Sequence, residues 1–116
     1  MSAEQNKAVV CHVLNELWKE NFGIADKHPG IQEVVPFIQH IHQAMSDSQH
    51  EIVQQFADGE WVATRQITEA THTGNFMGMP PTGERIRSET LMFHRVVNGF
   101  IVKQHSQGGR IDRMQP

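Results

Sequence analysis

Cysteine is almost absent from the 116-residue chain, since Cys11 is its single representative. One cysteine cannot form an intrachain disulfide, so a small fold stabilised by disulfide bonds is excluded. Positive charge is also scarce, because ten lysines and arginines face thirteen acidic residues and give a formal net charge of −3. No segment contains the cluster of basic residues that nucleic-acid binding requires, so we expect no nucleic-acid partner.

Long apolar runs are missing as well. None approaches the roughly 20 residues that span a bilayer, and residues 1–5 have neither the basic start nor the apolar stretch of a signal peptide. We therefore expect a cytoplasmic protein that does not associate with membranes. A chain of this length holds one core of marginal stability. We predict a single domain over residues 1–116, stabilised by association into a homodimer or a higher homo-oligomer.

Helical spacing dominates the first third of the chain. Apolar residues recur at that spacing from Val9 to Trp18. Ser2 and Gln5 stand ahead of them as a capping-box pair. This pattern predicts a helix over residues 3–22.

A second helical pattern covers residues 34–45, after a loop-like segment over residues 23–30. Pro36 lacks an N–H group and is tolerated only within about the first turn of a helix. The second helix is therefore expected to begin near residue 32 or 33. A kink at the proline is the alternative.

Strand-like patterns replace the helical ones after residue 50. Hairpin signals stand at Asp58-Gly59 and at Asn98-Gly99, and residues 74–84 form a loop rich in glycine and proline. The expected strands cover residues 51–57, 60–73, 85–97 and 100–107. Two helices followed by an antiparallel meander predict an α+β fold, in which helices cover one face of a curved sheet and leave a mostly apolar pocket.

The loop carries the most specific motif of the chain. Residues 72–83 read His-Thr-Gly-Asn-Phe-Met-Gly-Met-Pro-Pro-Thr-Gly, and Arg95 precedes the Asn98-Gly99 turn. This combination resembles the SnoaL-like polyketide cyclase family, whose members carry His-x-Gly-x-x-x-Gly-hydrophobic-Pro-Pro-Thr at this place and an arginine before a similar hairpin. The resemblance is continuous from about residue 30 to residue 106.

The resemblance implies the nuclear transport factor two-like cone, which is a bent mixed sheet wrapped against helices around a cavity. Family members that are enzymes close rings in polyketide esters by intramolecular aldol condensation, without metal or cofactor. We accordingly expect no cofactor here. One aspartate on the last strand serves those enzymes as acid and base, because a single group can remove a proton from carbon and return one to the new alkoxide.

The chain departs from this pattern at the catalytic positions. Ser106 occupies the position of the family's aspartate, and Met92 that of the histidine that some cyclases carry on the preceding strand. Asp112 is the next acid along the chain. The family's second short helix and first strand also have no room in residues 21–29. We expect a neighbouring chain to supply that wall of the cone.

The ligand pocket is assigned from the last hairpin. A regular two-residue turn at Asn98-Gly99 pairs Arg95 with Val102 and puts the side chains of alternate residues on one face. A β-bulge would invert part of this assignment. The predicted pocket residues are Leu91, Phe93, Gln104 and Ser106 from that face, with Phe76 and Met79 from the loop, where they form a lid, an oligomer contact or packing under the loop.

Three histidines are candidates for acid/base chemistry. His94 and His105 share the other predicted face of the hairpin and could form a general-base pair or part of a metal site. No third metal ligand is evident, so no metal site is predicted. His72 belongs to the loop motif, where it either orients the loop through its ring N–H or acts on a ligand at the cavity mouth.

Two functional hypotheses follow. In the first, the protein binds a small hydrophobic molecule in the cone cavity and the cyclase chemistry is lost. In the alternative, the protein is a cofactor-independent isomerase, hydratase or polyketide-type cyclase that uses a histidine as acid and base. A titratable side chain that points into the cavity favours the enzyme, and a filled interior favours a purely structural subunit.

Overall fold

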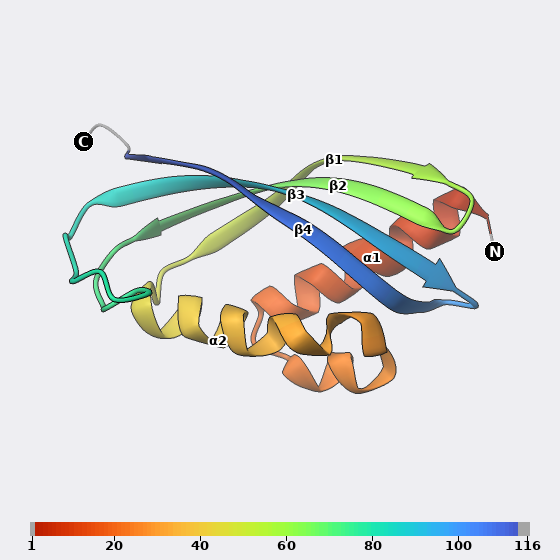
Figure 1. The fold of residues 1–116 in the computed structure, drawn as a ribbon, viewed down its shortest axis with the longest axis horizontal. Coiled ribbons are helices and arrows are strands. Elements are labelled where there is room, and N and C mark those ends of the chain that lie inside the picture. Colours follow the sequence, from red (N-terminus) through yellow and green to blue (C-terminus); the bar gives the residue numbers. More distant parts are fainter. Residues whose placement is uncertain (1, 114–116) are drawn as a thin grey trace.

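A computed structural model describes residues 2–113, with side chains described for residues 2–107. The helical elements are α1 (Ala3–Trp18), the 3₁₀ helices η1 (Phe22–Lys27) and η2 (Pro29–Val34), and α2 (Val35–Ala44). The strands are β1 (Gln49–Asp58), β2 (Trp61–Thr71), β3 (Arg85–Val97) and β4 (Phe100–Arg113). All the helices lie on one side of a curved, open sheet (Figure 1). The predicted α+β architecture is confirmed.

The capping box of α1 is formed as predicted. The Gln5 N–H donates to Ser2 Oγ over 3.1 Å, and the Ser2 N–H donates to Gln5 Oε1 over 2.8 Å. The helix ends at Trp18 instead of residue 22, because Glu20 adopts a left-handed φ of 66° that cannot continue a helix. No helix within residues 2–113 is long and apolar enough to cross a membrane.

The connection between α1 and α2 is made of the two 3₁₀ helices, and no strand lies in it. Pro36 falls in the first turn of α2, as expected for a residue without an N–H group. The turn of η2 packs directly on β4. A β-carbon at Gly30 would overlap the backbone of Val102 and Lys103, so only glycine allows this approach.

The sheet is antiparallel throughout, in the order β1-β2-β3-β4. The resemblance implied a mixed sheet, but each strand here pairs with its neighbour in the chain through a reversing connection. The predicted turn at Asn98-Gly99 is confirmed, because both residues have positive φ, 51° and 84°, and Val97 pairs with Phe100. In the first hairpin Asp58 pairs with Trp61, so the loop is one residue later than predicted.

The register of the last hairpin differs from the regular one. Arg95 pairs with Lys103, whereas Val96 pairs with Ile101. Val102 is therefore an extra, bulged residue on β4. A bulge shifts the alternation of side chains by one residue, so the assumed pairing of Arg95 with Val102 was wrong.

Two groups of buried apolar side chains hold the helices to the sheet. The larger one packs α1, η2 and α2 against the hairpin end of β3 and β4, and the smaller one joins the end of α2 to β2 and to the loop after it. Residues at the centre of the larger group include Val10, Leu17, Ile31, Val62 and Ile101.

Candidate functional site: a cavity between the sheet and the helices

A cavity of about 570 Å³ lies between the inner face of the sheet and the helices, a size common for small-molecule sites. The helical side of this cavity is apolar. It is formed mainly by Leu14, Trp18, Phe37, Ile38, Ile41 and Met45. The sheet side carries a polar strip, defined here as Gln66, Thr68, Ser88, Thr90, Gln104 and Ser106. A ligand in this cavity would have one apolar side and one side open to hydrogen bonds.

Every group of the polar strip is neutral, because amides and hydroxyls are its only functional groups. Among the described residues that line the cavity, Glu33 on η2 is the one titratable side chain, and it is exposed. Gln66 is buried and its Oε1 atom has no hydrogen-bond partner. The described walls therefore contain hydrogen-bonding groups but no buried acid or base.

The structure places the predicted pocket residues on both sides of the sheet. Gln104, Ser106 and Phe76 line the cavity. Leu91 and Phe93 are 48% and 52% exposed on the outer face, because the bulge at Val102 places His94 and Met92, not Phe93 and Leu91, opposite the cavity residues Gln104 and Ser106. That part of the assignment was wrong.

The loop after β2 contributes Met77 to the cavity in place of Met79, which is 50% exposed and lies outside the lining. Phe76 stacks on the ring of His40 in α2, with 5.3 Å between the ring centres. The Met77 N–H donates to His40 Nε2 over 3.3 Å. The tip of the loop is thus tied to α2 beside the cavity.

His94 is fully buried on the inner face, not on the outer face that the regular register implied. Its Nε2 atom lies 2.7 Å from Oε1 of Gln104, and its Nδ1 atom is buried without a partner. Burial lowers the pKa of His94, and the hydrogen bond to Gln104 opposes this only partly. His94 is therefore a neutral ring behind Gln104, and it is not part of the cavity wall.

The other two candidate histidines also lie away from the cavity. His72 is buried at the base of the loop, and its Nδ1 atom lies 3.3 Å from Thr82 Oγ1. His105 is exposed on the outer face and stacks on Trp61, with 6.0 Å between ring centres. His94 and His105 are thus on opposite faces. Residues with described side chains include no cluster of three or more histidine, cysteine or acidic residues that could hold a metal.

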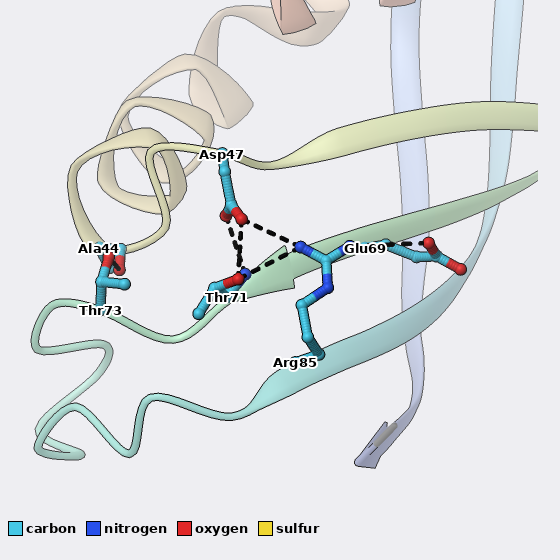
Figure 2. A network of polar contacts seen from close by, with 6 residues as sticks. All are labelled: Ala44, Asp47, Glu69, Thr71, Thr73 and Arg85. Carbon is cyan, nitrogen blue, oxygen red and sulfur yellow. Dashed lines mark hydrogen bonds and ion pairs between the residues drawn. The ribbon is translucent and has the colours of Figure 1, made fainter. Parts of the chain in front are cut away.

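A network of polar contacts fixes both ends of the loop (Figure 2). Asp47 accepts hydrogen bonds from the N–H and the hydroxyl of Thr71, over 2.8 and 2.7 Å, and from Nη1 of Arg85 over 3.0 Å. Thr71 precedes the loop and Arg85 follows it. The bonds from Thr71 are the main cause that lowers the pKa of Asp47. Sequence analysis did not predict this network.

Trp18 is held in place in the cavity wall by two imidazole rings. The ring centres of His42 and His50 each lie 5.4 Å from that of Trp18. His50 Nε2 lies 2.8 Å from Oδ1 of Asn15, and burial lowers the pKa of His50. The sequence pattern had identified Trp18 only as the last apolar residue of the first helical run.

Helices packed on one face of a curved, open antiparallel sheet define a small α+β protein with a cavity between the two layers. Comparison with known families agrees, because the model of the SnoaL-like polyketide cyclase family matches residues 6–115. The chain belongs to the SnoaL-like polyketide cyclase family.

Among curated proteins, the chain is similar to the aklanonic acid methyl ester cyclase DnrD of Streptomyces peucetius. The two are 36% identical over 59 residues, which is 50% of this chain and 41% of the cyclase. The matched segment is less than half of that enzyme.

Solved structures share the fold over nearly the whole chain. AclR of Streptomyces galilaeus, a proposed hydroxylase, has a TM-score of 0.82 at 24% identity, covering 93% of this chain and 81% of AclR. IdmH of Streptomyces antibioticus, a proposed polyketide cyclase, has a TM-score of 0.76 at 20% identity, covering 90% of this chain and 91% of IdmH. Proteins with different proposed chemistries thus share this architecture, so the fold alone does not define an activity.

Proposed function

We propose that this protein binds a small, uncharged, hydrophobic molecule in the cavity between sheet and helices, without the acid/base chemistry of the family's enzymes. One observation carries the proposal: the described lining pairs an apolar wall with a polar strip that has no titratable group. At the position of the family's catalytic aspartate, Ser106 offers a hydroxyl that can donate or accept a hydrogen bond.

Energetics favour a neutral ligand over a charged one. Apolar surface removed from water stabilises a complex by roughly 25 cal/mol per Å². A charged group buried against the polar strip would lose its hydration without an opposite charge in the strip to replace it. Amides and hydroxyls of the polar strip can instead satisfy neutral oxygens or N–H groups of the ligand.

The enzyme alternative, with a histidine as acid and base, draws no support from the candidate side chains. His94 lies behind Gln104, His72 binds within the loop and His105 is on the outer face. A general base needs to reach the proton that it removes, directly or through one water. None of the three lines the cavity.

A second copy of the chain is the proposed protein partner. The outer face of the sheet exposes a patch of large apolar side chains, defined here as the outer patch: Phe56, Trp61, Leu91 and Phe93. Contiguous apolar surface of this kind commonly marks an interface. A single domain and a cytoplasmic location, expected from the sequence, stay predictions.

The binding proposal is tested by titration with N-phenyl-1-naphthylamine, a neutral probe whose fluorescence rises in apolar surroundings. We expect saturable, one-to-one binding. Ile41→Trp fills the cavity from α2 and should weaken binding by about tenfold or more, which corresponds to roughly 1.4 kcal/mol. Gln43→Trp, at an exposed position of the same helix, is the matched control and should bind normally. Equal binding by both variants would contradict the proposal.

A further inference from the structure

The contact between His94 and Gln104 fixes which end of the Gln104 amide faces the cavity. Oε1 is the end that meets His94 Nε2, at 2.7 Å. Because a carbonyl oxygen only accepts hydrogen bonds, His94 must carry its proton on Nε2. Gln104 then has its NH₂ group left to donate to something in the cavity that it lines.

The reversed orientation of the Gln104 amide is less favourable in free energy. If the NH₂ group of Gln104 faced His94, Nε2 would have to accept and Nδ1 would carry the proton. Nδ1 is buried without a partner, so that tautomer would leave a buried N–H donor unpaired, which costs about 1–3 kcal/mol. In the arrangement observed, the buried Nδ1 is a bare acceptor on a ring that burial keeps neutral.

A second hydrogen-bond donor stands beside the first. Ser106 follows Gln104 on the same face of β4, about 7 Å further along the strand, and it also lines the cavity. Its hydroxyl can turn to donate to the same ligand oxygen or to a neighbouring one. This end of the polar strip therefore favours a ligand atom that accepts hydrogen bonds.

Resting on the proposed function, we infer that Gln104 selects ligands with a carbonyl oxygen at this end of the cavity, and that His94 is the residue that positions it. The ligand class is a neutral, largely apolar ketone or ester. His94 acts through Gln104 and does not touch the ligand.

The first test reads the tautomer of His94 in the unaltered protein by long-range ¹H–¹⁵N NMR of the imidazole nitrogens. The inference requires a neutral ring with its proton on Nε2 at pH 7. A ring with its proton on Nδ1 overturns the inference, because Gln104 would then present its carbonyl to the cavity. This measurement needs no variant of a buried core residue.

The second test compares two neutral naphthalene probes. 6-Propionyl-2-(dimethylamino)naphthalene has a ketone and no hydrogen-bond donor, and N-phenyl-1-naphthylamine has an N–H group and no oxygen. Gln104→Met should weaken binding of the ketone about fivefold and shift the emission of the bound ketone to shorter wavelength, because its carbonyl loses a donor. Binding of the amine should change less than twofold. Gln107→Met, at an exposed outer-face position of β4, should change neither.

The outcomes separate the two proposals. If the unaltered protein binds both probes and Gln104→Met weakens both equally or neither, the inference about Gln104 is wrong while the binding function stands. If the unaltered protein binds neither probe, the proposed function is wrong and the inference fails with it.

Discussion

Gly30 of η2 lies so close to Lys103 of β4 that a β-carbon at position 30 would overlap the Lys103 main chain. This contact holds η2, with the cavity residues that it carries, against the bulged part of β4. Gly30 itself lines the cavity. The close packing of this part of the cavity wall on β4 therefore requires a residue without a side chain at position 30.

Gly30→Ala should destabilise the protein by about 2 kcal/mol or more, because η2 would have to move away from β4. Gly23→Ala is the matched control, since a β-carbon there meets nothing within 4 Å. Urea unfolding of the two variants measures the difference. Equal midpoints would show that η2 does not pack on β4 in this way.

Asp47→Ala should loosen the loop between β2 and β3 without unfolding the core. Removing the carboxylate takes the acceptor from the N–H and the hydroxyl of Thr71, and leaves Arg85 with Thr71 Oγ1 and Glu69 as its remaining partners. We expect amide hydrogen exchange in residues 71–85 to speed up about fivefold or more, because a lost charge-assisted hydrogen bond weakens the closed state by about 1–2 kcal/mol. Asp26→Ala, at an exposed position on η1, is the control. Unchanged exchange in both variants would contradict the role given to Asp47.

Stability should fall as the solution is acidified from pH 7.5 to pH 5. Burial lowers the pKa of His28, His50 and His94 in the folded state, whereas an unfolded histidine titrates near pH 6.5. Below that value the unfolded chain binds more protons than the folded one, so acid favours unfolding.

His28 allows this pH dependence to be dissected. Its Nδ1 atom accepts the N–H of Ile101 over 2.9 Å. Asparagine can also accept at this place but does not titrate, so His28→Asn should flatten the plot of unfolding free energy against pH. His105→Asn, on the exposed outer face, is the control and should keep the original slope. A slope that is the same in both variants would rule out His28 as a source.

The outer patch predicts self-association. Phe93→Lys should shift the protein to monomers in sedimentation velocity, because a charge in the centre of an apolar interface loses its hydration on association. Gln43→Lys, an exposed change on α2, should leave the association state unchanged. A protein that is already monomeric at high micromolar concentration would refute the proposed homodimer.

The sequence predicted the elements better than the face that each residue occupies. The Asn98-Gly99 turn and the capping box at Ser2 each involve residues that are close together in the sequence. A short stretch of sequence is therefore enough to predict them. The bulge at Val102 arises where η2 packs on β4, a contact between distant parts of the chain. One extra residue on β4 was enough to place His94, instead of Phe93, opposite Gln104.

The cavity was predictable in outline only. Ser106 was identified because the resemblance places the family's aspartate there, Gln104 because it shares a strand face with Ser106, and Phe76 because it lies in the loop motif. The apolar wall from α1 and α2 depends on how the helices cross the sheet, and no local sequence pattern predicts that crossing. Asp47 was missed for the same reason, since its partners lie 24 and 38 residues away in sequence.

The methionine methyl groups provide the most direct measurement of the central claim. Met45 and Met92 are buried and line the cavity, whereas Met79 is exposed outside it. With ¹³C-methyl methionine labels assigned by single Met→Leu changes, saturating N-phenyl-1-naphthylamine should shift the resonances of these two cavity methyls and leave that of Met79 in place. Unchanged cavity methyls, or a shift confined to Met79, would contradict binding inside the molecule.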